Sequence, residues 1–416
     1  MKRPDRLIAL ETAVAAGDGS ALNAFWSDAA ARGGPLVERA DGPNAWDITF
    51  FWRGDADTHR VLLFGGFAGL RLIDMAQIPG TDVWYAGHRA ASGLRTSYEF
   101  RPNVELEGDI NSDPALVVQA VQSEGWSPDP LNPDRIDFGV PQAPTMSIVA
   151  VPDAPPQPWL RSRAGVPAGT VEPHRFDSVM LGNARVIWTY TPPGYRTDGE
   201  PYPLVVLFDG FDYSKIGIAS TLDNLIAEQR IPPVICVMIH QLDRISELPC
   251  NAQFIDCIAD ELLPRWVRER YHATGDRVRT VAGGLSFGGL AAAWAGFRRP
   301  DVVGNVLSQS GSFWWGPGAP VPARLDDTSI EWEWLVHQYE ASPRLPLRFY
   351  LDVGTRELPF HKGIQPNMVA CNRVMRDVLE AKGYDVQYAE FVGGHDYACW
   401  RGTVADGLIA LLGPFA

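Results

Sequence analysis

A serine between two glycines is the residue of this chain best suited to covalent chemistry. Ser286 stands in the pattern Gly284-Leu285-Ser286-Phe287-Gly288, after an apolar run and before an alanine-rich stretch. The two glycines allow the sharp strand-to-helix turn that lifts a serine hydroxyl above the edge of a sheet. So short a pattern also occurs by chance, but here it lies between an expected strand and an expected helix. We therefore predict that Ser286 is a nucleophile.

A serine hydroxyl becomes reactive when a base removes its proton and a third group orients that base. His395 lies in Gly393-Gly-His-Asp396, directly after the last expected strand, where a loop can return over the sheet. His337 and His361 also follow the serine, the first within an expected helix and the second at the start of one. A structural role is the alternative for His395, but the chain order serine, acid, histidine favours it as the base.

The acid of such a triad is expected on the loop after the preceding strand. The apolar strand 347–353 is followed by Gly354-Thr-Arg-Glu357, which puts Glu357 in that place. Asp352 is the rival, although it still lies within the strand. Asp396 is adjacent to His395 in sequence and is poorly placed to orient it. We predict Glu357 as the acid.

Two backbone N–H groups must stabilise the oxyanion that forms on the substrate. One is expected from Phe287, next to the nucleophile. The other is expected from the loop after an early strand, in Leu204-Val-Val-Leu-Phe-Asp-Gly-Phe211. We assign the second donor to Phe211, with Gly210 as the second choice.

Composition limits the classes of partner. The chain has 416 residues, enough for two or three domains, and its 36 Lys+Arg against 50 Asp+Glu give a net charge of −14. This charge argues against nucleic acid and anionic membranes as partners. The five cysteines have no metal spacing and indicate reduced thiols in the cytoplasm. Glu11 and Asp18 interrupt the N-terminal apolar run, so no export signal and no membrane span are expected.

The first third of the chain predicts short helices followed by an all-β domain. Residues 5–32 have helical periodicity and end at Gly33-Gly34. The following runs are short, rich in aromatic residues and separated by turns, which indicates an antiparallel sandwich of Ig-like or early-set type within 1–140; they are 47–52, 60–64, 83–85 and 94–100. Their aromatic side chains are expected in the core, with an exposed binding face as the alternative. A proline-rich linker is expected at 141–180.

A catalytic α/β domain is expected at 181–416. Continuous apolar runs alternate there with helical stretches, which is typical of a parallel sheet covered on both faces. The strand-like runs are 185–190, 204–208, 234–239, 279–282, 303–307, 347–351 and 386–391. The nucleophile, acid and base candidates all follow such runs.

From residue 204 to the C-terminus, the chain resembles the enterochelin (enterobactin) esterases of the esterase D branch of the α/β-hydrolases. The similar motifs are Leu207-Phe-Asp-Gly210, Glu247-Leu-Pro-Cys-Asn-Ala252, Glu261-Leu-Leu-Pro264, Gly284-Leu-Ser-Phe-Gly-Gly289, Leu307-Ser-Gln-Ser-Gly-Ser-Phe-Trp-Trp315, Gly354-Thr-Arg-Glu-Leu-Pro359 and Gly393-Gly-His-Asp-Tyr-Ala-Cys-Trp-Arg-Gly402. The last is the most specific, because general esterases share the serine motif but not this continuation after the histidine. Weaker similarity extends to Phe51-Trp-Arg53, Tyr98-Glu-Phe100, Asp129-Pro-Leu-Asn-Pro133 and Pro141-Gln-Ala-Pro144.

The resemblance implies cytoplasmic hydrolysis of a ferric tri-catecholate siderophore, a macrocyclic trilactone of dihydroxybenzoyl-serine, which helps to release iron. It implies Ser286, Glu357 and His395 as the triad and a sandwich domain that helps to cover the substrate. No cofactor and no protein-bound metal are implied, because the iron arrives with the substrate.

A trianionic substrate needs local cations in so acidic a chain. Three arginines lie near the catalytic loops in sequence, with ordinary surface or ion-paired roles as the alternative; they are Arg244, Arg356 and Arg401. Three tryptophans follow strands at the same edge and either stack on catechol rings or pack in the core; they are Trp314, Trp315 and Trp400. Glu247 is expected to fix a loop through an ion pair.

Two other functions compete with the siderophore esterase. A feruloyl or acetyl esterase acting on plant polysaccharide is one, although the missing export signal counts against an extracellular substrate. A siderophore- or glycan-binding protein that has lost activity is the other. The complete set of triad residues counts against a pure binder.

Overall fold

The computed structural model describes residues 3–414 apart from 69–70, 105–116, 118–119, 122–123, 141–144, 322, 324 and 360–365. The chain divides into two compact units. The N-terminal unit comprises Met1–Pro155 together with Val392–Ala398, and the second unit comprises Pro156–Phe391 together with Cys399–Ala416. The segment that contains His395 therefore belongs to the N-terminal unit, although it follows the last strand of the second.

The N-terminal unit begins with two helices and continues with two antiparallel sheets. The helices are α1 (Asp5–Ala15) and α2 (Ala21–Arg32), and a 3-10 turn, η1 (Gly66–Ala68), follows β3. One sheet has the order β1 (Leu36–Arg39), β2 (Ala45–Arg53), β6 (Val83–Ala91), β5 (Ala76–Gln77). The other has the order β4 (Ile73–Asp74), β3 (Val61–Gly65), β7 (Arg95–Pro102), β9 (Met146–Ala150), β8 (Arg135–Ile136). The structure adds β1, β4, β5, β8 and β9 to the strands that the sequence predicts.

Aromatic residues at alternate strand positions form the core of this unit. Phe50 of β2 and Phe100 of β7 are fully buried and belong to one cluster that draws on both sheets. The ring centroids of Phe50 and Tyr98 lie 4.8 Å apart in an edge-to-face arrangement. The Tyr98 hydroxyl donates to Asp129 at 2.7 Å, which gives part of the Asp129–Pro133 motif a structural role. For these aromatic residues the packing interpretation is confirmed.

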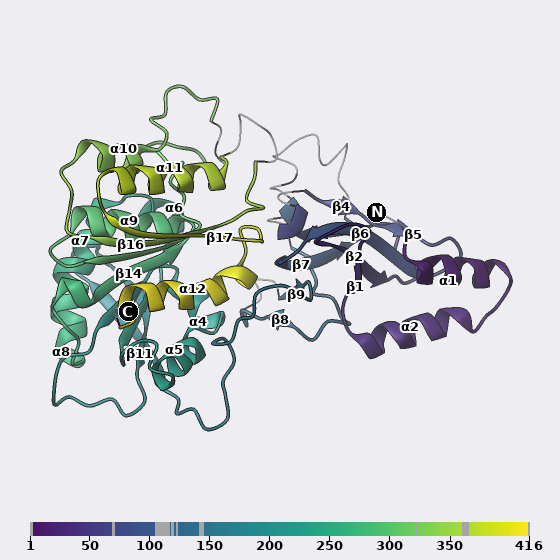
Figure 1. Ribbon diagram of the computed structural model, residues 1–416, viewed down its shortest axis with the longest axis horizontal. Coiled ribbons are helices and arrows are strands. Elements are labelled where there is room, and N and C mark those ends of the chain that lie inside the picture. Colours follow the sequence, from purple (N-terminus) through teal and green to yellow (C-terminus); the bar gives the residue numbers. More distant parts are fainter. Residues whose placement is uncertain are drawn as a thin grey trace. The chain divides into compact units, whose positions relative to one another are not determined.

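The second unit is built on an eight-stranded sheet (Figure 1). Its order is β10 (Thr170–Ser178), β11 (Asn183–Thr191), β13 (Ile235–Ile239), β12 (Leu204–Leu207), β14 (Thr280–Leu285), β15 (Asn305–Gln309), β16 (Arg348–Gly354), β17 (Asp385–Phe391). The pairs β10–β11 and β11–β13 are antiparallel, and the remaining pairs are parallel. Strands β12 to β15 are buried along their whole length, as strands covered on both faces must be.

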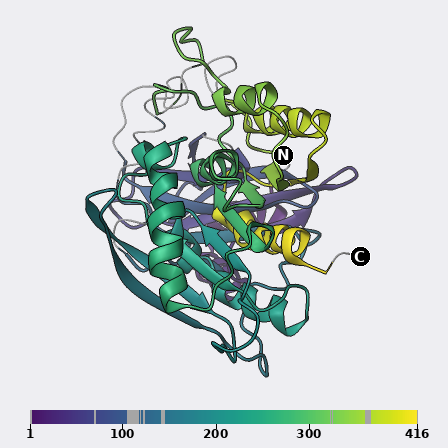
Figure 2. The same cartoon turned by 90° about the vertical axis from the view of Figure 1, so that its left-hand side faces the viewer.

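Helices cover both faces of this sheet. They are α4 (Gly210–Lys215), α5 (Ile218–Ala227), α6 (Arg244–Glu247), α7 (Ala252–Cys257), η2 (Ile258–Val267), α8 (Arg268–Arg270), η3 (Arg277–Arg279), α9 (Phe287–Arg298), α10 (Trp334–Ala341), α11 (Met368–Ala381) and α12 (Tyr397–Leu412). One core cluster joins the sheet to α7, η2, α9, α10 and α11, while α4, α5 and α12 lie on the other face (Figure 1). The segments α7, η2 and α8 follow one another as a continuous helical run (Figure 2). The α/β class expected from the sequence is confirmed.

The expected linker at 141–180 needs correction. Strand β9 lies within it and pairs with β7, and strand β10 lies within it and pairs with β11. Proline does not exclude a strand here, because β10 lies at the edge of the sheet, where Pro173 is tolerated without a lost ladder bond. The motif Pro141–Pro144 lies outside the described residues.

All five cysteines are free thiols, as the sequence indicates. Among the residues that the structure describes, no helix is both long and apolar enough to cross a membrane.

Candidate active site

Ser286 occupies the tight turn between β14 and α9. Its backbone has φ 57° and ψ −118°, a conformation that residues with a side chain rarely adopt. Its N–H donates to the carbonyl of Gln309 at 2.8 Å, and its own carbonyl accepts from Ser312 N–H at 3.1 Å. These bonds to the segment after β15 hold the strained turn in place, with the serine side chain half-buried.

The glycines around Ser286 are required by close backbone and side-chain approach. A Cβ at Gly284 would lie 2.3 Å from the carbonyl carbon of Gly288. A Cβ at Gly288 would lie 2.2 Å from Oδ2 of Asp209. Both distances are far below any real contact, so the turn can form only with glycine at these two positions. This is the geometry that the sequence motif predicts.

A short segment after β15 connects the predicted nucleophile with the predicted acid. The hydroxyls of Ser286 and Ser312 lie 3.4 Å apart. Two residues earlier, the Ser310 hydroxyl donates to Oε1 of Glu357 at 2.6 Å. The same carboxylate oxygen accepts from Gly354 N–H at 2.7 Å. The carboxylate of Glu357 is thereby fixed just beyond β16, on the edge of the sheet where the serine stands.

The rival acid, Asp352, lies inside β16 and is completely buried. Burial raises the pKa of its carboxyl to about 8, and the nearby charge of Glu357 acts in the same direction. A carboxyl that is mostly protonated at pH 7 cannot stabilise a histidine cation by its charge. Glu357 is therefore the better placed of the two carboxyls, and its role as the acid stays a prediction.

His395 is exposed and lies between β17 and α12. Its neighbour Asp396 is buried and uses its carboxylate to bind strand β7, accepting from Thr96 Oγ1 at 2.8 Å. Asp396 is thus engaged elsewhere, as its sequence position suggested. His337 lies in α10 as expected, and His361 lies outside the described residues. The assignment of His395 as the base stays a prediction.

The predicted oxyanion donors stand in the first turns of two helices. Phe287 opens α9, and Gly210 and Phe211 open α4 directly after β12. Amides in a first turn have no acceptor within their own helix, so they are suited to bind a developing negative charge. A Cβ at Gly210 would lie 2.4 Å from the backbone of Ile239, so α4 starts tightly against β13.

Arg244 lies beside the nucleophile turn. Its Nε donates to Oδ1 of the buried Asp209 at 2.7 Å, and its Nη2 donates to the carbonyl of Leu285 at 3.2 Å. Its guanidinium carbon lies 5.6 Å from the ring centroid of Phe287. Arg244 is thus ion-paired with Asp209, which is the alternative left open for it, while about a third of its side chain, 32%, stays exposed next to the serine turn. Sequence reasoning assigned no role to Asp209, although the Leu207–Gly210 motif contains it.

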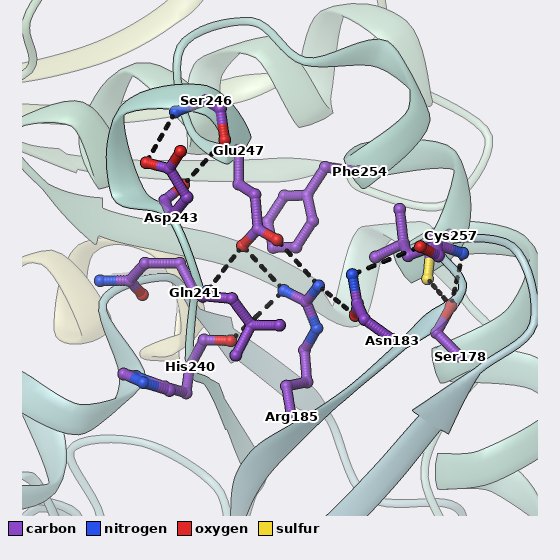
Figure 3. Close-up of polar contacts among 12 residues, drawn as sticks. Ser178, Asn183, Arg185, His240, Gln241, Asp243, Ser246, Glu247, Phe254 and Cys257 are labelled. Atoms are coloured by element: carbon purple, nitrogen blue, oxygen red, sulfur yellow. Dashed lines mark hydrogen bonds and ion pairs between the residues drawn. The ribbon is translucent and has the colours of Figure 1, made fainter.

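The loop before α6, the helix that begins at Arg244, is fixed by a largely buried ion pair between Arg185 and Glu247 (Figure 3). Glu247 accepts two bonds of 2.9 Å from Arg185 of β11. It also accepts from Leu242 N–H at 3.0 Å. Asn183 accepts a further bond from the guanidinium at 2.9 Å. The expectation that Glu247 fixes a loop is confirmed.

The remaining candidates for substrate binding differ in exposure. Trp400 is only 2% exposed, and its Nε1 donates to the Ser310 hydroxyl at 2.9 Å. Trp314 is also buried, which favours the packing alternative for both, whereas Trp315 is half-buried. Arg356 is exposed on the loop before Glu357.

Arg401, the last of these candidates, is 8% exposed and donates to Gln157 Oε1 at 3.2 Å. The surface alternative therefore does not apply to it. Sequence reasoning missed Ser310, although the polar run in Leu307–Trp315, placed after a buried strand, is the signal that marks it.

Two family models match this chain, and curated proteins are similar to it over most of its length. The family model described as putative esterase matches residues 178–411, and the model described as enterochelin esterase, N-terminal, matches residues 47–160. The iron(III) enterobactin esterase of Dickeya dadantii is 31% identical, covering 94% of this chain and 92% of that protein. The protein of the same name from Escherichia coli O6:H1 is 34% identical, covering 82% of each chain.

Solved structures extend the match to the fold. The ferric enterobactin esterase of Salmonella typhimurium has a TM-score of 0.78 at 29% identity, covering 94% of this chain and 98% of that one. The enterobactin esterase of Shigella flexneri, crystallised in the presence of enterobactin, has a TM-score of 0.75 at 30% identity, covering 91% and 95%. These matches confirm the α/β-hydrolase-like fold. Because they extend over most of its length, this chain belongs to the family of iron(III) enterobactin esterases.

Proposed function

We propose that this protein hydrolyses the ester bonds of a ferric tri-catecholate siderophore such as enterobactin. The observation that carries the proposal is the strained Ser286 turn, connected through the segment after β15 to the carboxylate of Glu357, in a chain of this family. Relatives over most of its length are named iron(III) enterobactin esterases. Cleavage of the lactone backbone would weaken the hold of the ligand on iron.

The reaction follows from the residues in these positions. Ser286 Oγ attacks the ester carbonyl carbon while His395 takes the hydroxyl proton, and the N–H groups of Phe287 and Phe211 stabilise the oxyanion. The bond between the carbonyl carbon and the leaving oxygen, which belongs to a serine unit of the substrate, then breaks. His395 returns the proton to that oxygen. Water, deprotonated by His395, then attacks the carbonyl carbon of the acyl-enzyme. This step releases the carboxylic acid product and regenerates the hydroxyl of Ser286. Glu357 stabilises the histidine cation in both steps.

Substrate binding needs positive charge at this edge. Arg244 supports the proposal because a third of its side chain is exposed beside the nucleophile turn, while Asp209 holds it from the other side. We also propose that Arg356 and Trp315, which are not buried, contribute to binding the catecholates. For the N-terminal unit, an Ig-like sandwich that helps to bind the substrate stays a proposal, as does a cytoplasmic location.

Mass spectrometry of reaction products tests the proposal. The purified protein is incubated in parallel with ferric enterobactin, metal-free enterobactin and a feruloylated sugar. We expect dihydroxybenzoyl-serine or its linear oligomers. Ser286→Ala should fold normally and give no product, whereas Ser162→Ala, at an exposed serine of the same unit, should leave turnover unchanged. Release of ferulate alone would assign the protein to the polysaccharide esterases, and the absence of any product would indicate a binding protein.

A further inference from the structure

The loop that carries His395 is bound to the N-terminal unit through a buried carboxylate. Oδ2 of Asp396 accepts from Thr96 Oγ1 at 2.8 Å and from the backbone N–H of Ser97. Oδ1 accepts from Ala398 N–H at 2.8 Å. Asp396 is 3% exposed, so water does not compete for these bonds. A buried carboxylate whose two oxygens accept three hydrogen bonds is held in one orientation.

The backbone of the His395 loop passes so close to η1 that only glycine fits at the point of contact. A Cβ at Gly394 would lie 2.5 Å from the carbonyl oxygen of Gly66, and a Cβ at Gly66 would lie 2.7 Å from Oγ1 of Thr96. Two residues before Gly394, the carbonyl of Val392 accepts from Arg95 N–H at 3.2 Å. The loop therefore meets β7 and η1 at three successive positions, Val392, Gly394 and Asp396, and the last two flank His395.

Another buried carboxyl, that of Glu99, lies on β7 near this point. Glu99 of β7 is 6% exposed, and burial together with the negative charge of Asp396 raises its pKa to about 8. At neutral pH its carboxyl is mostly protonated. Asp396 accepts from both Thr96 and Ser97, and the Thr96 hydroxyl also lies 3.1 Å from the carbonyl oxygen of Ser97.

We propose that Thr96 and Asp396 are positioning residues, through which the N-terminal unit holds the loop that presents the base His395. The inference rests on the proposed function, in which His395 takes the proton of Ser286. A base displaced by about 1 Å can cost up to roughly a hundredfold in rate. Groups that bind the rest of the substrate would not be affected, so kcat should fall while KM changes little.

Steady-state hydrolysis of ferric enterobactin by matched variants tests this inference. Thr96→Val keeps the side-chain shape and removes the donor, and we expect kcat to fall about tenfold or more with KM within about twofold. Thr96→Ser keeps the hydroxyl and should restore most of kcat. Asp396→Asn should also lower kcat, because its amide NH2 would face a donor. Thr49→Val is the control: Thr49 is buried in the same unit, its hydroxyl has no partner among the described residues, and kcat should stay unchanged.

The outcomes separate this inference from the proposed function. Thermal unfolding of each variant shows whether a lower kcat reflects unfolded protein, and Asp396→Asn carries the test if Thr96→Val does not fold. If both folded variants keep the parental kcat while His395→Ala abolishes turnover, the positioning role is overturned and the base assignment stands. If His395→Ala keeps its activity, the proposed mechanism fails first. Equal loss in Thr49→Val would also overturn the inference.

Discussion

Replacing Glu247 by glutamine should destabilise the second unit strongly, because the change leaves a buried arginine without its counter-charge. The side chain of Arg185 is 1% exposed and that of Glu247 is 13% exposed, and the two are joined by a pair of 2.9 Å bonds. Breaking a buried ion pair by removing one partner costs about 3 to 5 kcal/mol. Asn183 and the carbonyl of His240 still accept from the guanidinium, so we expect the lower end, about 3 kcal/mol.

Thermal unfolding at pH 7 measures this effect. For a unit of this size, about 3 kcal/mol corresponds to a decrease in Tm of roughly 6 to 12 °C. Asp177→Asn is the matched control, since Asp177 and its partner Arg175 are 68% and 73% exposed, and its effect should stay below about 1 kcal/mol. Unfolding by urea gives an independent value of the free energy of unfolding. Because urea is uncharged, it does not screen the ion pair.

The double variant Arg185→Met with Glu247→Leu gives the sharper test. Replacing both charges by apolar side chains removes the desolvation cost together with the attraction, so the double variant should be more stable than Glu247→Gln alone. The reasoning is refuted if Glu247→Gln unfolds at the Tm of the Asp177→Asn control. It is also refuted if the double variant is less stable than the single one.

Two further changes test the nucleophile turn and the buried acid. Gly288→Ala should lower the free energy of unfolding by about 1 to 3 kcal/mol and should also lower turnover, because its Cβ would lie 2.2 Å from Asp209 Oδ2. An unchanged free energy of unfolding in urea would contradict this geometry. Asp352, with its pKa raised to about 8, binds a proton more tightly when folded, so it lowers stability progressively as pH rises from about 4 to 8. Asp352→Asn should therefore gain stability relative to the parent between pH 5 and pH 8, and unfolding curves whose difference does not vary with pH would argue against a raised pKa.

Much of the fold could be predicted because its signals are local. The apolar runs of β12 to β15 and the glycines around Ser286 follow from side-chain periodicity and from backbone conformations that only glycine allows near each turn. Strands such as β9 and β10 were missed because their pairing depends on partners distant in the chain, while their prolines resemble a linker. The exposure of a side chain also depends on partners distant in the chain. The sequence left packing and stacking open for Trp400, and the burial of its side chain favours packing.

The sequence by itself determined which chemistry we predict, because the order of the candidate nucleophile, acid and base and the residue types around them are properties of the chain. Only the tertiary structure decided which groups support those residues. Ser310 reaches Glu357, Asp209 holds Arg244, and Asp396 binds β7 across 299 residues of sequence. The physical reason is that a buried polar group needs a partner, and folding rather than proximity in sequence determines which partner it meets.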